Sequence, residues 1–144
     1  MNTQASIDIQ RPVDVVFAYL IDPRHRAEWL SGTAEVEELT PGPIAIGKRW
    51  RFNARPRGKQ VTIETEVVAF EPGRRLTERI VKGPLSGEIS ATFESVGSAT
   101  RVTAQAVDVK LNGALRLFQR MVATRLEQRL SNGLRDVKRT LEKA

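Results

Sequence analysis

One acidic side chain lies where a carboxylate could do chemistry. Glu78 is part of the alternating segment 76–81 and shares the parity of Leu76 and Ile80, so its carboxyl group should point to an apolar face. A buried carboxyl group without a partner has a raised pKa and can exchange a proton with a bound substrate. Two structural alternatives remain: a bulge that shifts the register, or a position at the wet end of the strand beside an arginine.

Three other polar residues have weaker patterns. Thr65 also faces the apolar side and could bond a ligand, although a core threonine bonded to the backbone is the commoner arrangement. Asp108 has inward parity but lies near the end of its segment, where we expect it to meet solvent. His25 is the sole histidine and has Glu28 three residues on. A catalytic histidine usually needs such an orienting carboxylate, but two flanking arginines place this one in a basic turn.

Several kinds of site are excluded by composition. The chain has no cysteine, which rules out disulfides, thiolate zinc sites and cysteine catalysis, and one histidine rules out a histidine-rich metal site. There is no catalytic triad spacing and no glycine-rich phosphate loop. The sequence therefore predicts neither a metal nor a cofactor.

Positive charge is concentrated in two segments. The net charge of the 144-residue chain is +6, while residues 48–59 alone contribute +6 and residues 112–144 contribute +5. Such segments attract anions, nucleic acid or acidic membrane surfaces, although arginine-rich surfaces often serve solubility only. Arg51 and Arg55 also fall opposite acidic residues of the next predicted strand, so part of the cluster is explained by sheet pairing.

The elements follow from hydrophobic periodicity. Residues 5–10 alternate as a half-buried strand, and residues 12–21 have helical spacing with Pro12 as the first helical residue. Asp22-Pro23 ends that helix, and one or two further turns follow, anchored by Trp29. Short turns then separate strands that should pair as antiparallel neighbours: 34–39, 49–55, 60–70, 76–81, 85–96 and 100–110.

The last segment predicts one long amphipathic helix of about thirty residues, roughly 45 Å long. A helix with such a one-sided stripe must cover an apolar surface, and the sheet offers the only one. The stripe consists of Leu115, Phe118, Val122, Leu126, Leu130, Leu134, Val137 and Leu141.

This order of elements resembles the START-like superfamily, also called SRPBCC or polyketide cyclase/dehydrase-like, which has the helix-grip fold. The likeness spans nearly the whole chain. It implies a single α+β domain over residues 1–144, with a curved antiparallel sheet of about seven strands wrapped around the C-terminal helix and two short helices after the first strand. The stretches that carry the likeness are 11–20 followed by Trp29, 41–43 with 47–49, 70–76 and 97–103.

The resemblance also implies a cavity between sheet and helix that holds lipids, sterols, polyketides or other apolar molecules. Small residues on the inner faces (Ala54, Ala91, Ala104 and Ala106) could leave room for a ligand or could simply let the helix pack closely. The expected walls are Trp50, Phe52, Ile63, Thr65, Val67, Leu76, Glu78, Ile80, Ile89, Phe93, Val102, Ala104, Phe118 and Val122.

Three functions remain open at this stage. The first is binding of a small hydrophobic or amphipathic ligand; the second is a cyclase- or dehydratase-like enzyme that uses Glu78; the third is an interaction module with a basic surface. Nucleic-acid binding is not favoured, because the aromatic residues lie on buried faces, whereas a weak contact with an anionic membrane or acidic protein stays an alternative.

No run of residues is apolar and long enough to span a bilayer, and the first residues lack a signal-peptide pattern, so we expect a cytoplasmic protein.

Overall fold

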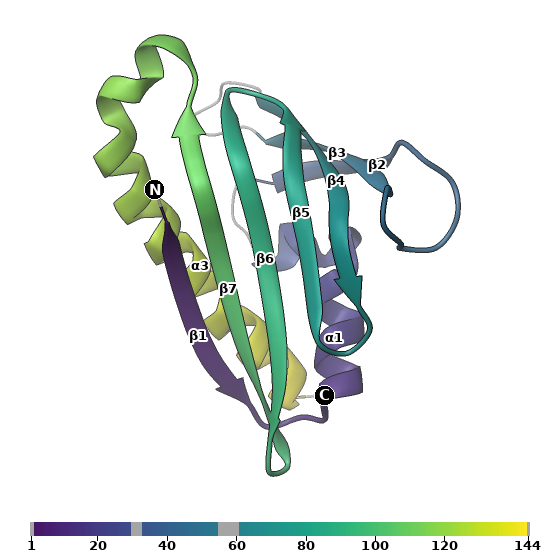
Figure 1. Ribbon diagram of the computed structural model, residues 1–144. Helices are drawn as coiled ribbons and strands as arrows, with labels where there is room; N and C mark the ends of the chain where they lie inside the picture. Colours follow the sequence, from purple (N-terminus) through teal and green to yellow (C-terminus); the bar gives the residue numbers. More distant parts are fainter. Residues whose placement is uncertain (1, 30–32, 55–60, 144) are drawn as a thin grey trace.

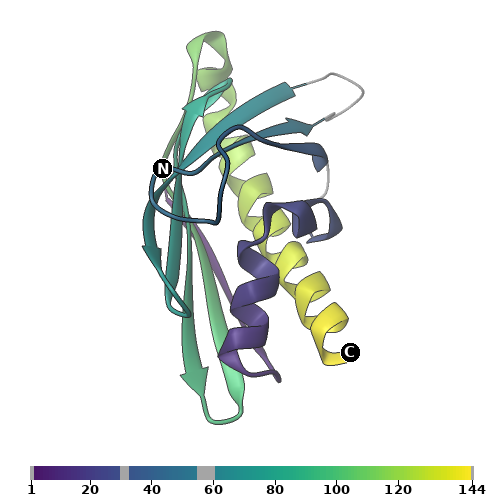
Figure 2. The same ribbon diagram turned by 90° about the vertical axis from the view of Figure 1, so that its right-hand side faces the viewer.

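The protein is a curved antiparallel sheet with its helices on one face. The structure, a computed structural model, describes residues 2–29, 33–54 and 61–143. The seven strands have the order β1-β7-β6-β5-β4-β3-β2. Figures 1 and 2 show α1 and α3 on the same side of this sheet, with α3 running diagonally across it. This is the helix-grip α+β architecture that the sequence predicts.

The observed elements match the predicted ones within a few residues. The strands are β1 (Thr3–Ile9), β2 (Thr33–Glu38), β3 (Arg49–Ala54), β4 (Val61–Glu71), β5 (Arg75–Lys82), β6 (Leu85–Val96) and β7 (Ala99–Leu111). The helical elements are α1 (Val13–Ile21), η1 (Pro23–His25), α2 (Arg26–Trp29), η3 (Gly113–Phe118) and α3 (Gln119–Lys143).

Helix α1 closes the end of the sheet near the β6–β7 turn. The sequence predicted Pro12 as the first helical residue. In the structure the helix begins one residue later, and Pro12 precedes it with φ −62° and ψ 153°. Its lack of an N–H still suits the helix start. Phe17 packs edge-on against Phe93 at a ring-centroid distance of 5.0 Å and stacks on Phe70 at 6.1 Å. These contacts place α1 in the main core.

The C-terminal helix covers the sheet with only part of its stripe. Leu130, Leu134, Val137 and Leu141 are buried and belong to the main core. The expectation that the whole stripe is covered is wrong at its beginning, where the chain forms the 3-10 helix η3 and Phe118 is 51% exposed. The long α-helix therefore begins at Gln119 rather than directly after Asn112.

Polar contacts fasten the C-terminal end of α3 to the start of the chain. The backbone N–H of Gln10 donates to Glu142 Oε2 over 2.8 Å, and Lys138 Nζ donates to the carbonyl of Asp8 over 2.7 Å. Arg11 Nη1 also donates to the carbonyl of Leu141 over 3.3 Å. The last turns of the helix are thus tied to β1 and the following loop.

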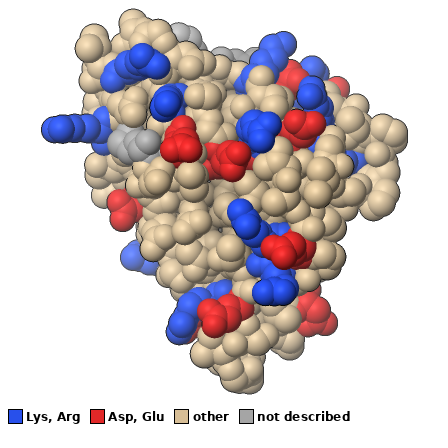
Figure 3. Space-filling view, in the orientation of Figure 1, with Lys and Arg blue, Asp and Glu red and all other residues tan. Residues whose placement is uncertain are grey.

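Ion pairs connect neighbouring strands on the outer face of the sheet. Arg51 lies 3.5 Å from Glu64 of the next strand, as predicted, and 2.9 Å from Glu37 of the preceding strand, which was not predicted. Arg55, the other expected partner, lies outside the described residues. Figure 3 looks onto this outer face and shows blue and red side chains next to one another. Much of the positive charge of residues 48–59 that the structure describes is therefore paired within the sheet.

Candidate functional site

The centre of the candidate site is the carboxylate of Glu78 on the inner face of β5. The side chain is 6% exposed. Its Oε1 accepts a hydrogen bond from the Thr65 hydroxyl over 2.9 Å, and its Oε2 accepts one from Arg26 Nη2 over 2.6 Å. The inward parity predicted for Glu78 and Thr65 is therefore observed, and the buried carboxylate has a cationic partner.

Strand register brings these groups together. Val67 of β4 lies opposite Glu78, and Thr65 lies opposite Ile80. Thr65 and Glu78 are thus diagonal neighbours on one face, a separation that polar side chains can bridge. The register irregularity that the sequence left open does exist: it occurs twice, between Glu64 and Thr65 and between Val67 and Ala69, on both sides of this stretch. It leaves Glu78 pointing inward.

Arg26 reaches the site from the one-turn helix α2. The Asp22 carboxylate caps the preceding turn by accepting the Arg24 backbone N–H, and the Arg24 side chain holds the pKa of Asp22 below its usual range. Arg24 points to solvent, whereas the Arg26 side chain is 13% exposed and its guanidinium lies 4.3 Å from the Phe52 ring centroid. Among the described residues, Glu78 alone accepts hydrogen bonds from this guanidinium, so several of its N–H donors remain available.

Apolar side chains of β3, β4 and β5 surround this polar centre. Together with Phe52 they form an inner-face patch that is separate from the main core under α1 and α3. The buried members of this patch are Trp50, Phe52, Val67, Leu76 and Ile80. A polar centre inside an apolar surface is the arrangement that orients an amphipathic ligand.

The other expected wall residues are distributed differently. Phe93, Val102 and Ala104 lie in the main core, and Ala91 packs against it. Ile63, Ile89 and Val122 are half-buried. Phe118 is on the exposed η3 turn and is not part of a buried wall. The side chains of Ala54 and Trp29 lie outside what the structure describes.

The histidine and the second acid are not part of the candidate site. His25 stacks on Tyr19 at 4.3 Å, and its Nδ1 lies 2.9 Å from the Tyr19 carbonyl oxygen. Glu28 accepts the Tyr19 hydroxyl over 2.6 Å, so it does not orient the imidazole. Burial and this bond raise the pKa of Tyr19. Asp108 is exposed with φ 53°, in agreement with its predicted contact with solvent.

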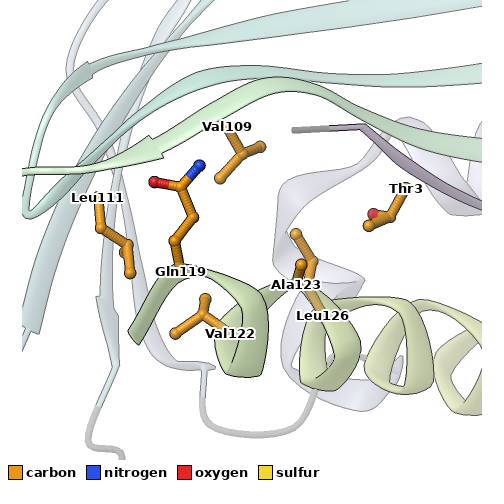
Figure 4. Close-up of a pocket in the computed structure, with 7 residues that line it drawn as sticks. All are labelled: Thr3, Val109, Leu111, Gln119, Val122, Ala123 and Leu126. Carbon is orange, nitrogen blue, oxygen red and sulfur yellow. The ribbon is translucent and has the colours of Figure 1, made fainter. Parts of the chain in front are cut away.

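A small hollow lies beside the first turns of α3. It has a volume of about 10 Å³, which a single water molecule would fill. Figure 4 shows its lining, which comes from β1, β7 and the first turns of α3: Thr3, Val109, Leu111, Gln119, Val122, Ala123 and Leu126. Of the predicted wall residues, Val122 alone is among those that line this hollow. The hollow is too small for an organic ligand.

Two buried cations were missed by the sequence reasoning. Arg26 belongs to a run of basic residues that is typical of a surface turn. Its helix has only four residues, which is too few for a hydrophobic periodicity to show that the Arg26 side chain points inward. Lys48 is buried, donates to the carbonyls of Thr40 and Gly42 over 2.6 and 2.7 Å and to Glu38, and lies 5.0 Å from the Trp50 ring. The only signal for Lys48 is the preceding turn-rich loop, whose carbonyl groups need a donor.

The described residues contain no group of three or more acidic or histidine side chains placed to hold a metal ion. No helix within the described ranges is long and apolar enough to cross a bilayer.

Comparison with solved structures supports the same architecture. The chain has a TM-score of 0.81 with a protein of Thermus thermophilus, at 18% identity over 96% of this chain and 95% of the other. With the Zhui aromatase/cyclase of a Streptomyces species the chain has a TM-score of 0.73 and 17% identity, over 98% of this chain and 95% of the other. With a START superfamily protein of Mycobacterium smegmatis the TM-score is 0.75 and the identity 13%, over 97% of this chain and 98% of the other.

At the sequence level, no curated protein matches the chain. The profile of the family described as "Polyketide cyclase / dehydrase and lipid transport" matches residues 1–142, which is nearly the whole chain. With the helix-grip fold and a polar centre on its inner face, the chain belongs to the polyketide cyclase/dehydrase and lipid transport family.

Proposed function

We propose that the protein binds a small amphipathic molecule between the inner face of the sheet and α2. The polar end of this molecule accepts hydrogen bonds from Arg26, and its apolar part lies against Trp50, Phe52, Val67 and Ile80. The observation that carries the proposal is the buried Arg26–Glu78 pair, with Thr65, in the middle of an apolar patch.

The cost of burying charge supports a ligand-binding role for the pair. Replacing a buried ion pair by apolar residues of similar volume is often neutral or stabilising, so folding alone does not require it. Glu78 and Thr65 hold the guanidinium in place beside Phe52. Its unused N–H groups then form a fixed donor set for a carbonyl, phenol or carboxylate oxygen.

The family description adds support for the class of ligand. It names polyketide cyclisation or dehydration and lipid transport, whose substrates are apolar molecules that carry oxygen. The Zhui structure is that of an aromatase/cyclase. A donor set inside an apolar patch suits the oxygen of either class.

Two fluorescent probes can test the polar anchor. 8-Anilino-1-naphthalenesulfonate carries an anionic acceptor group, whereas N-phenyl-1-naphthylamine has the same rings without it. We expect the wild type to bind both probes. In the variant Arg26→Met/Glu78→Leu, the affinity for the sulfonate should fall about tenfold, which is the value of one charge-assisted hydrogen bond, while the affinity for the neutral probe persists.

The matched control is Arg79→Met/Glu88→Leu. It removes an ion pair of 3.6 Å that joins β5 to β6 on the outer face of the sheet, and it should leave both affinities unchanged. The proposal is wrong if the wild type binds neither probe, or if the inner variant loses both affinities equally.

A second candidate function is cyclase or dehydratase chemistry with Glu78 as the proton-transferring group. The observation in its favour is that the Glu78 carboxylate, already bonded to a hydroxyl and a guanidinium, lies where a bound carbonyl would meet both a donor and an acceptor. Incubation with a synthetic poly-β-ketone thioester tests it. Mass spectrometry should then detect loss of water that wild type accelerates and Glu78→Gln does not.

A further inference from the structure

The turn between β7 and α3 exposes several large apolar side chains at one end of the molecule. Leu117 is 87% exposed, and Leu115, Phe118 and Met121 are between 46% and 51% exposed. The spacing of three and four residues places them close together on η3 and the first turn of α3. We name this group the η3 tip; it comprises Leu115, Leu117, Phe118 and Met121.

Basic side chains accompany the η3 tip, and acidic ones are missing from its surroundings in sequence. The segment 109–126 contains Lys110, Arg116, Arg120 and Arg125 and no Asp or Glu. All four cations are exposed, and none of them forms an ion pair with a described acidic side chain. In Figure 3, this end of the molecule, at the upper left, shows blue side chains set among tan ones.

This pattern differs from that of four basic side chains on the outer face of the sheet. Arg49, Arg51, Arg79 and Arg101 are all paired with acidic residues on the outer face of the sheet. The cations around the η3 tip form no ion pair with a described acidic side chain, so their charge can interact with an external partner. Exposed apolar groups flanked by unpaired cations are the combination that binds an anionic membrane surface.

We propose that the η3 tip docks on an anionic lipid bilayer. Leu117 and Phe118 enter the interface between head groups and acyl chains, while Arg116 and Arg120 contact lipid phosphates. Charge favours this partner over a second copy of the chain, because a symmetric contact between two tips would bring like charges together. This inference does not depend on the proposed ligand site, which lies on a different part of the inner face.

Co-sedimentation with vesicles tests the proposal. The full chain is mixed with vesicles of phosphatidylcholine alone or with about a third phosphatidylglycerol, which supplies the anionic charge. We expect binding to the anionic vesicles that weakens as salt is raised, and little binding to the neutral ones.

Two variants and their controls locate the contact. Leu117→Glu/Phe118→Glu and Arg116→Gln/Arg120→Gln should each lower the partition coefficient on anionic vesicles at least tenfold, since one arginine near the surface contributes a factor of about five. Ile46→Glu changes an apolar residue that is 70% exposed on the distant β2–β3 loop, and Arg74→Gln/Arg135→Gln removes two exposed cations elsewhere. The apolar control should bind as the wild type does, and the charge control should lose less than about threefold.

The proposal is overturned by any of three results: no binding of the wild type, equal binding to neutral vesicles, or equal losses in the controls. A self-association in sedimentation velocity that Leu117→Glu/Phe118→Glu abolishes, without vesicle binding, would assign the tip to a second copy.

Discussion

Arg26 and Glu78 are 52 residues apart in sequence, and a hydrogen bond of 2.6 Å joins them inside the fold. The bond links the short helix α2 to the middle of the sheet. Because α2 has a single turn and cannot be stable alone, this ion pair fixes where the helix lies. It thereby also fixes the direction of the remaining Arg26 donors.

Removal of one partner of this pair should destabilise the fold. We expect Arg26→Met or Glu78→Leu alone to lower the free energy of unfolding by about 3–5 kcal/mol, because each leaves a buried charge without a partner. The double substitution should cost no more than about 1 kcal/mol, since no charge is left buried. Urea unfolding measures all three. Additive costs in the double variant would contradict the idea of a coupled pair.

A second prediction concerns Gly87, at the bulge where β6 passes β7. Its φ is +135°, and an added Cβ would lie 2.9 Å from Val109 Cα and 3.0 Å from the Val107 carbonyl oxygen. Gly87→Ala should therefore cost about 2–3 kcal/mol, from backbone strain and from the clash with backbone atoms that cannot move aside.

Gly97 is the matched control for this prediction. It also has a positive φ, +62°, but no atom lies within 4 Å of an added Cβ. Gly97→Ala should cost only the left-handed backbone term, about 1 kcal/mol. Equal thermal shifts for the two variants would show that crowding at Gly87 contributes nothing.

The pH dependence of stability should include a contribution from Glu142. The hydrogen bond from Lys138, together with the Gln10 N–H, lowers the pKa of Glu142 below 4.5. A carboxyl group with a lowered pKa in the folded state stabilises the fold above its unfolded pKa, and this stabilisation is lost as the pH falls through the folded value. Thermal unfolding from about pH 6 down to pH 3 should therefore show a smaller decline in Glu142→Gln than in the wild type. An unchanged slope would argue against the contact in solution.

Tyr19 provides a clean spectroscopic test because it is the only tyrosine. Burial and the bond to Glu28 raise its pKa above the ordinary 10.0, so the phenol should stay protonated in the folded protein at pH values where a free tyrosine ionises. Stability should accordingly decline as the pH rises above about 10, since the unfolded state then ionises first. Absorbance titration measures the midpoint, and Glu28→Gln should lower it. A midpoint near 10.0 in the folded wild type would contradict the hydrogen bond between Tyr19 and Glu28.

The fold was predictable because local signals agree with the global arrangement. Glycine and proline turns separate the strands from β3 to β7, and the predicted bounds of β6, 85–96, are those observed. Alternation placed Glu78 and Thr65 on the inner face for the same reason, because a strand allows only two directions for a side chain. Both inferences use neighbours in sequence alone.

The partner of Glu78 could not be predicted in this way. Arg24 and Arg26 are two residues apart in the same basic turn, yet the side chain of Arg24 is 78% exposed and that of Arg26 only 13%. Their difference depends on how α2 meets the sheet, which is a long-range packing outcome. The prediction for the beginning of the helical stripe was wrong for a related reason: periodicity shows that a face is apolar, but not whether Phe118 has a surface to cover.

Helix α3 is attached unevenly, because the hydrogen bonds between its described residues and the start of the chain hold its C-terminal end and not its beginning. Its last turns are bonded to Asp8, Gln10 and Arg11, whereas its first turns rest over the small hollow beside Val109. Amide hydrogen exchange should therefore slow steadily from residue 119 toward residue 141, because opening near the start breaks few tertiary contacts. A bending load applied at the η3 tip would be resisted chiefly at the far end, about 20 residues and about 30 Å away along the axis.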